Sequence, residues 1–406
     1  MTLLFRVVWG SEVDRALRPV LAVGLVSSIA GGTAYPFLGI WAIDRLGASP
    51  SALSVGFLCG ALAAGAVGYV GGHLSDHLGR RPLILAGWAG QALTGPALVF
   101  ATGDVVLGLV ALASFGATGA LGQAADTAMV ADLVPPERHE AAYAAVRVAN
   151  NLGVSIGPPL GGLLLFGHHW TRLWLGMAAL SAIGWLIALR YIPRSGRYKP
   201  EERPQRGSLS VIRRDYAFLV FAGSTVLAAM TYVAYETLLP ISLVASHGMA
   251  PSTWGFLLVV NPILVTFVQL RLTRALAGIP APVKLAVAMP LMGLPFLVLT
   301  ATAAIPVVAA LIVLFVIGEM LWIPSSQSIV AAFAPADIRG AYMGVIGSAW
   351  AVAWAIGPFV GLQVRAGFGD TTMWASVAAI SVVAAVSGAA AGRGKESRPV
   401  EAAMAA

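Results

Sequence analysis

Long apolar runs are the feature that most limits the folds open to this chain. Hydrophobic residues make up 58% of its 406 residues and charged residues only 11%, whereas a soluble domain carries about 25% charged residues. Each run has at least the roughly 20 residues that an α-helix needs to cross a bilayer. Twelve runs follow one another, at about 17–43, 51–72, 82–101, 105–132, 140–166, 171–191, 216–246, 252–272, 282–302, 305–333, 340–364 and 371–391. We therefore predict an all-α, polytopic membrane protein with twelve transmembrane helices.

Basic residues predict the orientation of these spans. Of the 25 Lys and Arg residues, Arg45, Arg172 and Arg365 are expected outside and Arg147 falls within a span, while all the others lie on one side. Lys and Arg are retained on the cytoplasmic side of a membrane. The bias predicts a cell (inner) membrane protein with both termini cytoplasmic. It also accounts for the net charge of +7 without nucleic-acid binding.

One polar segment divides the runs into two sets of six. Residues 193–215 are rich in Pro, Gly and charge, as expected of a cytoplasmic linker between an N-terminal half, 1–192, and a C-terminal half, 216–406. The two halves share a weak sequence repeat, in which Gly157-Pro158 in the fifth run corresponds to Gly357-Pro358 in the eleventh. Parallel repeats of six spans are typical of one class of secondary transporters.

The connection between the second and third runs reads Gly72-His-Leu-Ser-Asp76-His-Leu-Gly79-Arg80-Arg81, and we expect a tight cytoplasmic loop there. It resembles the signature loop between helices 2 and 3 of the major facilitator superfamily, although His77 stands where that family usually has Arg or Lys. The resemblance implies a conformational gate. In it, Asp76 faces the start of span 11 and Arg80 reaches Asp132. The implied gate residues are Gly72, Asp76, Gly79, Arg80, Arg81 and Asp132.

The fifth run carries small residues at four-residue spacing together with a proline. Such spacing lets two helices approach closely, and Pro158 removes a backbone hydrogen bond, so the helix can bend there. Packing alone would explain the pattern. It also resembles the antiporter motif of drug:proton exporters, which implies a hinge and interface element. The motif residues are Gly153, Gly157, Pro158, Gly161 and Gly162.

Three acidic residues, Asp126, Glu236 and Glu319, fall well within the runs, where an ionisable group is costly and rarely kept without a function. Glu319 lies near the middle of its run, the depth at which coupling-ion sites lie in secondary transporters. We predict proton-coupling roles for these carboxyls, with a structural carboxyl as the alternative for Glu319. Asp126 and Arg147 are both about 12 Å from the cytoplasmic ends of neighbouring spans. This match predicts an ion pair, and snorkelling of Arg147 to the headgroups is the alternative.

Aromatic and polar residues in the spans are candidates for a substrate cavity. Glu236 stands beside two tyrosines, which suggests a wall that meets a cation by charge and by ring face, or else a carboxylate satisfied by tyrosine. Trp350 and Trp354 share a helix face at i, i+4 spacing, a pattern that packing alone can also produce. The candidates are Tyr35, Asn150, Tyr232, Tyr235, Trp350 and Trp354.

The sequence favours transport over catalysis. It has no cluster of metal ligands and no phosphate-cradling Gly-Lys-Ser/Thr loop, so we expect no enzyme activity and no cofactor, with the proton gradient as the energy source. The resemblance implies a monomeric drug:proton antiporter that exports lipophilic drugs or natural products by alternating access, as in multidrug efflux and antibiotic resistance. Three carboxyls against Arg147 favour a cationic substrate. A sugar or metabolite transporter and an uncoupled facilitator are the alternatives.

Overall fold

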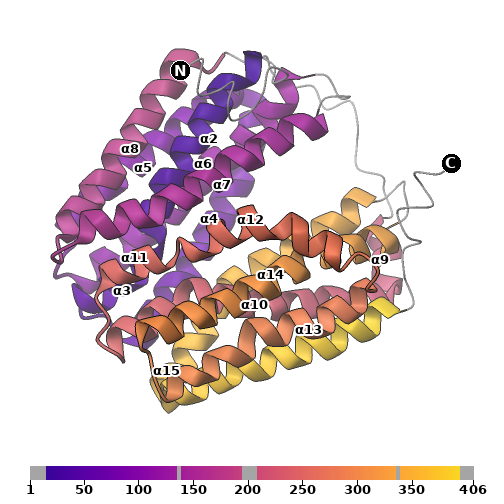
Figure 1. Cartoon of the computed structure of the whole chain (residues 1–406). Helices are drawn as coiled ribbons and strands as arrows, with labels where there is room; N and C mark the ends of the chain where they lie inside the picture. The colour runs from indigo at the N-terminus through magenta and orange to yellow at the C-terminus, as the bar shows by residue number, and fades with distance from the viewer. Residues whose placement is uncertain (1–14, 135–138, 194–207, 335–338, 394–406) are drawn as a thin grey trace. The chain divides into compact units, whose positions relative to one another are not determined.

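The computed structural model describes residues 15–134, 139–193, 208–334 and 339–393, and every regular element in these ranges is a helix (Figure 1). The elements are η1 (Arg15–Leu17), α2 (Arg18–Ala34), η2 (Tyr35–Phe37), α3 (Leu38–Asp44), α4 (Pro50–Leu78), α5 (Arg80–Phe100), α6 (Val105–Leu133), α7 (His139–Leu165), α8 (Trp170–Tyr191), α9 (Ser208–Arg214), α10 (Tyr216–Ala245), α11 (Pro251–Leu257), α12 (Val260–Ala275), α13 (Ala281–Gly293), η4 (Leu294–Thr300), α14 (Ile305–Phe333) and α15 (Arg339–Gly392).

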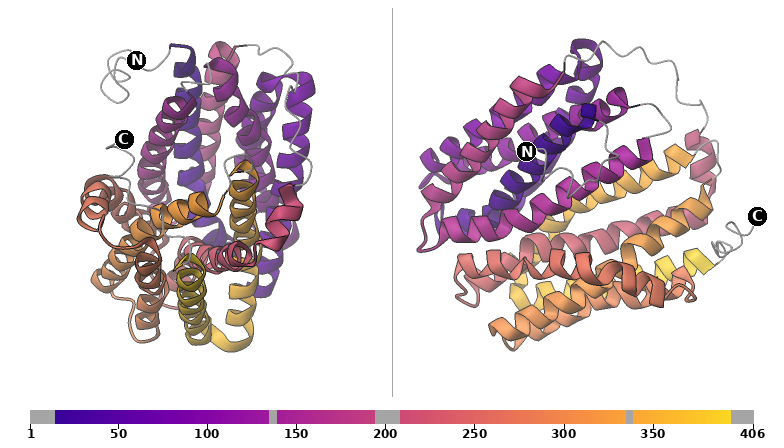
Figure 2. Two further views of the ribbon diagram at one scale, coloured as in Figure 1. Left: turned by 90° about the vertical axis from the view of Figure 1, so that its right-hand side faces the viewer. Right: turned by 45° about the horizontal axis from the view of Figure 1, so that its top comes forward.

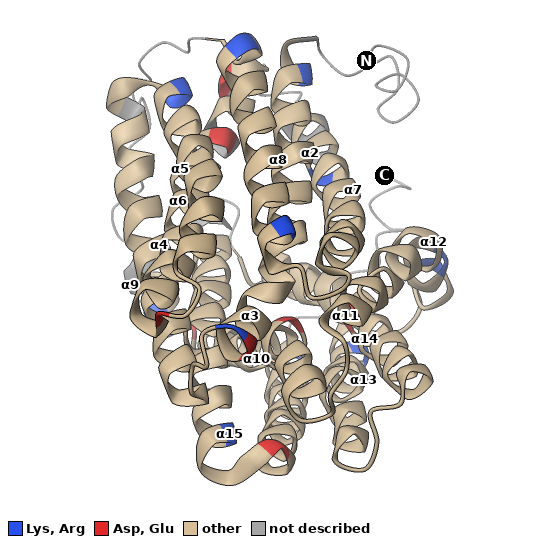
Figure 3. Ribbon diagram, turned by 90° about the vertical axis from the view of Figure 1, so that its left-hand side faces the viewer, with Lys and Arg blue, Asp and Glu red and all other residues tan. Residues whose placement is uncertain are grey.

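Each predicted span corresponds to one helix, to part of a helix, or to two or three consecutive helices. Within the described residues, ten helical segments are long and apolar enough to cross a membrane, and the last of them, 342–392, contains a backbone break at Gly369. That break separates the runs predicted at 340–364 and 371–391, while α7 covers the run predicted at 140–166. Figure 3 shows how few Lys, Arg, Asp and Glu residues interrupt the helices. The predicted all-α membrane fold is confirmed.

The chain packs into two compact units. Unit 1 comprises Met1–Glu201 and Gly248–Val259, and unit 2 comprises Glu202–His247 and Val260–Ala406. The change of unit near residue 201 falls in the polar linker. The chain returns to unit 1 at Gly248 and leaves it again after Val259, inside the eighth span, so α11 belongs to unit 1 and α12 to unit 2.

Unit 1 is a bundle of long helices (Figure 2). In it, α2 packs on α7 and α8, α4 packs on α6, and α5 packs on α6 and α8. Its core includes the buried side chains of Ile84, Trp88 and Met129. Glycine permits the close approach of α5 and α6, because a Cβ added at Gly87 would lie 2.8 Å from the backbone nitrogen of Gly122. Without water, close van der Waals contact is the main attraction between such helices.

Unit 2 is built around α10, which packs extensively on α15, while α13 packs on α14 and α15. A polar network joins the end of α10 to the turn within α15. The Ser242 hydroxyl donates to Asp370 Oδ2 at 2.6 Å and accepts from Trp374 Nε1 at 3.2 Å. Arg365 forms an ion pair with Asp370 and donates to Ser246 Oγ at 2.9 Å. These contacts fix the register of α10 against both parts of α15.

The connection predicted as a loop at Gly72–Arg81 is shorter in the structure. Helix α4 continues to Leu78 and α5 begins at Arg80, so only Gly79 is non-helical between them. Gly79 has φ 91° and ψ 162°, a conformation that glycine alone adopts readily. The prediction of a loop across Gly72–Arg81 is therefore corrected, because polar residues can continue a helix beyond the apolar region.

Asp215 precedes α10 and accepts two hydrogen bonds. Its Oδ1 accepts from Phe218 N at 3.1 Å, and its Oδ2 accepts from the Tyr342 hydroxyl of α15 at 3.1 Å. We expect Asp215→Ala to lose a helix cap, about 1 kcal/mol, and an interhelical hydrogen bond, about another 1 kcal/mol. Thermal unfolding in detergent measures this loss as a lower Tm.

Asp104→Ala is the matched control. Asp104 caps α6 by accepting from Leu107 N at 2.9 Å, and the contact is exposed. It should lose the cap contribution alone. Equal Tm shifts for the two variants would contradict a stabilising role for the bond from Tyr342.

Candidate functional site

In unit 1, Arg80 lies at the junction of α4, α5 and α6. Its Nε is 3.2 Å from Asp132 Oδ2, and its Nη1 donates to Ser75 Oγ at 2.7 Å. The Ser75 hydroxyl donates in turn to the Gly72 carbonyl at 2.8 Å. Arg80 is only 6% exposed, so a planar, always-charged group is enclosed by directed acceptors. The predicted contact between Arg80 and Asp132 is confirmed, and its role in gating stays a prediction.

Arg81 ties the same junction to the end of another helix. Its Nη2 donates to the Leu189 carbonyl, near the C-terminus of α8, at 2.6 Å. Terminal carbonyls of a helix lack intrahelical donors, and a cation is favoured there. The side chain of Asp76 lies outside the described residues, so the contact predicted for it stays untested.

The glycine motif of α7 forms a close interface with α2. A Cβ added at Gly153 would lie 2.8 Å from the Leu25 carbonyl oxygen, and one at Gly157 would lie 2.8 Å from the Ile29 carbonyl oxygen. The Thr33 hydroxyl contacts the carbonyl oxygens of Ile29 and Gly157 at 2.7 Å and 3.2 Å. Any side chain at these glycines would push α7 away from α2.

The outer part of the same motif contacts two further elements of unit 1. A Cβ at Gly161 would lie 2.6 Å from the Phe37 ring, and one at Gly162 would lie 2.9 Å from the Ser252 carbonyl oxygen in α11. Gly255 of α11 is equally constrained, because its Cβ would lie 2.7 Å from the Pro158 carbonyl oxygen. The motif is thus a packing surface for both α2 and α11.

Asp126 and Arg147 do not form the predicted ion pair. Arg147 is exposed, and the described residues contain no Lys or Arg within ion-pair distance of Asp126. One carboxyl oxygen of Asp126 is buried without a hydrogen-bond partner. Exposure of Arg147 agrees with the snorkelling alternative, since a long side chain can reach water from within a span.

Two cavity candidates of unit 1 lie on the helices that carry the close glycine interface. Asn150 of α7 accepts a hydrogen bond at its Oδ1 from the Ser28 hydroxyl of α2 at 3.2 Å. Tyr35 is partly buried in η2, beside the fully buried Pro36 that interrupts the first span. Asn150 therefore tethers α7 to α2 in this structure.

Unit 2 brings together two carboxyls that are far apart in sequence. Glu236 of α10 and Glu319 of α14 lie close enough to interact electrostatically, and Tyr232, one turn before Glu236 in α10, lies near both acids. Asn261 of α12 donates from Nδ2 to Glu319 Oε2 at 2.7 Å. No Lys or Arg in the described part of the chain forms an ion pair with either acid. Two like charges without a countercharge are mutually unfavourable in such surroundings.

Aromatic rings lie next to the two carboxyls. The Tyr232 ring is 5.4 Å from that of Trp350 and 5.8 Å from that of Phe315. Trp350 is in turn 5.2 Å from Trp322, and Tyr235 stacks on Phe315 at 4.1 Å. Trp354 is partly buried one turn beyond Trp350. The structure therefore unites Tyr232, Tyr235 and Trp350 in one aromatic cluster.

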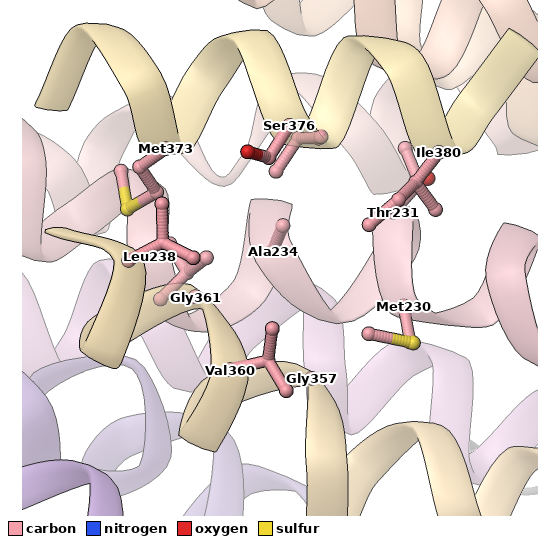
Figure 4. Close-up of a pocket in the computed structure, with 12 residues that line it drawn as sticks. Met230, Thr231, Ala234, Leu238, Gly357, Val360, Gly361, Met373, Ser376 and Ile380 are labelled. Atoms are coloured by element: carbon pink, nitrogen blue, oxygen red, sulfur yellow. The ribbon is translucent and has the colours of Figure 1, made fainter. Parts of the chain in front are cut away.

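A separate pocket in unit 2 is lined by α10 and both parts of α15 (Figure 4). Its volume is about 30 Å³, room for roughly one water molecule. Thr231 and Ser376 are the polar residues among its largely apolar walls. A drug-sized ligand needs at least about 300 Å³, so this pocket is not a substrate site.

Asn261, Gln269, Phe315 and Trp322 were not predicted as site residues. Asn261 and Gln269 are amides within an apolar run, and this pattern alone could have marked them. Phe315 and Trp322 carry no such signal, because apolar aromatics are also common in packing. Their place near the acids follows from tertiary contacts.

Comparison with known proteins identifies the relatives of the chain. The model of the Major Facilitator Superfamily matches residues 3–358. A Na(+), Li(+), K(+)/H(+) antiporter of Planococcus maritimus is 21% identical over 367 residues, which are 82% of this chain and 86% of that protein. The multidrug resistance protein MdtH of Klebsiella pneumoniae (strain 342) is 25% identical over 312 residues, 76% of each chain.

A solved structure shares the fold at lower sequence identity. The nucleoside transporter NupG superposes with a TM-score of 0.78 at 13% identity, covering 93% of this chain and all of its own. At such identity the likeness shows the fold alone.

The close interface of α7 with α2 gives a second expectation. Gly157→Ala should destabilise the fold by about 1–3 kcal/mol, because the new methyl group meets backbone atoms that cannot rotate away. Gly347→Ala is the control, since a Cβ there meets nothing within 4 Å. The Tm of each variant in detergent checks this, and an equal effect at both positions would refute the packing explanation.

Proposed function

Because the chain belongs to the major facilitator superfamily, we propose that it is a proton-coupled antiporter that exports lipophilic cations across the cell membrane, with both termini cytoplasmic. Transport by a multi-pass membrane protein is the property of the family. The coupling to protons, the outward direction and the cationic substrate are the proposal.

The juxtaposition of Glu236 and Glu319 is the observation that carries this proposal. One acid comes from α10 and the other from α14, and they interact electrostatically without a basic partner in the described residues. A negative pair in a low-dielectric setting is stabilised by a proton or by a cation. Binding one in place of the other is the exchange that an antiporter performs.

The aromatic cluster supports an organic rather than a hydrophilic substrate. The rings of Tyr232, Trp350 and Trp322 form a continuous series that runs from α10, beside Glu236, through α15 to α14. Ring faces attract cations, especially where water is excluded. A sugar would need many hydrogen-bond partners for its hydroxyls, and the described groups around the acids provide few.

An inorganic cation:proton antiporter is the second candidate. The relative from Planococcus maritimus exchanges alkali cations for protons according to its name, whereas MdtH is named for multidrug resistance. Both readings use the same carboxyls, and they differ in whether the aromatic rings contribute to binding.

Replacement of Glu319 tests proton coupling. In proteoliposomes, Glu319→Gln should abolish efflux of tetraphenylphosphonium driven by a pH gradient, because an amide cannot exchange a proton. Asp104→Asn, at an exposed helix cap, should transport normally. Proton movement is followed with a trapped pH-sensitive dye. Unaltered pH-driven efflux by a folded Glu319→Gln variant would remove the coupling assignment.

Replacement of Trp350 tests the substrate class. A ring face contributes about 1–2 kcal/mol to the binding of a cation. Trp350→Leu removes such a ring and should therefore raise the KM for tetraphenylphosphonium by about 10-fold. Trp185→Leu, a partly buried tryptophan of unit 1, is the control. Transport of Na⁺, Li⁺ or K⁺ that is insensitive to Trp350→Leu, with no exchange of the organic cation, would favour the inorganic candidate.

A further inference from the structure

Helix α14 presents two acceptor groups at neighbouring positions, the carboxyl of Glu319 and the backbone carbonyl of Met320. In an α-helix that carbonyl would accept from the N–H of residue 324. Residue 324 is a proline within the helix, so it has no N–H to donate. The Met320 carbonyl therefore lacks its helical donor in a span where water is scarce and an unmet carbonyl is costly.

Helix α12 supplies a donor to each of these acceptors. Asn261 Nδ2 donates to Glu319 Oε2 at 2.7 Å, and Gln269 Nε2 donates to the Met320 carbonyl at 3.0 Å. The two amides are eight residues apart and lie on the same stripe of the helix. Gln269 uses its second N–H for Thr273 Oγ1 at 3.1 Å.

Within unit 2, helix α12 packs against few other elements. None of its residues is fully buried, and α14 is its main neighbour in the described structure. The helix begins at Val260, immediately after the point where the chain leaves unit 1. Two side-chain amides are thus among the contacts that attach it to α14.

We propose that Asn261 and Gln269 are positioning residues that clamp α12 onto α14, one through Glu319 and the other through the carbonyl that Pro324 leaves without a donor. The Asn261 bond is charge-assisted when Glu319 is a carboxylate, and it weakens when Glu319 is neutralised. The Gln269 bond does not depend on Glu319. Occupation of Glu319 therefore loosens one end of α12 while the other end stays attached.

The groups that face Glu319 are consistent with this dependence. Asn261 approaches from α12, while Glu236, Tyr232 and Tyr235 interact with it electrostatically from α10. Of these residues, Asn261 is the one that belongs to α12, the helix in which no residue is fully buried. The link to transport rests on the function proposed above, whereas the clamp itself does not.

A cycle between Gln269 and Pro324 tests the clamp. Gln269→Met keeps the size of the side chain and removes both donors, so Tm should fall by about 2 °C and amide hydrogen exchange in 260–275 should accelerate. In a Pro324→Ala background the new N–H serves the Met320 carbonyl, and Gln269→Met should then have little effect. Thr273→Val is the control that removes only the other partner of Gln269.

A second cycle separates the two ends of the clamp. Asn261→Leu should accelerate amide hydrogen exchange in α12 of the parent protein, but not in a Glu319→Leu background. Pro324→Ala should not restore slow exchange to the Asn261→Leu variant. Exchange in α11, which packs on α7 within unit 1, should stay unchanged. Equal effects of Gln269→Met with and without Pro324 would overturn the proposal. These measurements need no transport, so failure of the proposed function would leave their outcome unaffected.

Discussion

The scarcity of water around the spans is the constraint on which the rest of this structure depends. A polar group there must find its partner within the protein, and helices meet this demand for most of the backbone. Several of the remaining groups are met individually. Thr33 bonds carbonyls of α2 and α7, and Arg80 is surrounded by Asp132 and Ser75. Such pairings fix which helices are neighbours.

The two units meet this constraint in different ways. Unit 1 relies on glycine, which brings backbones into contact at Gly87, Gly153 and Gly157, and on arginines at the junction of α4, α5 and α6. Unit 2 contains an acid pair and a series of neighbouring aromatic rings. The weak sequence repeat of the halves thus coexists with a division of chemistry: close backbone contacts at glycine characterise one unit, and a pair of acids beside aromatic rings characterises the other.

The sequence predicted the spans closely, because a long apolar run has few alternatives to a helix. It also predicted Arg80 with Asp132, whose types and positions follow a recognisable motif. The pair of Asp126 and Arg147 failed, since matching depth does not determine the direction in which each side chain points around its helix. The acid pair of Glu236 and Glu319 was not predicted as a contact, because residues 83 apart meet only through the packing of α10 and α14.

The eighth span is divided between the units, and this has a consequence for any attempt to separate the halves of the chain. Helix α11 follows the linker in sequence, yet it covers Gly162 and Pro158 of α7. A fragment that ends in the linker would expose this small-residue surface to lipid. The second fragment would carry α11 within its sequence, between α10 and α12. When the two fragments are produced together, α11 of the second fragment can therefore cover the small-residue surface of α7 in the first.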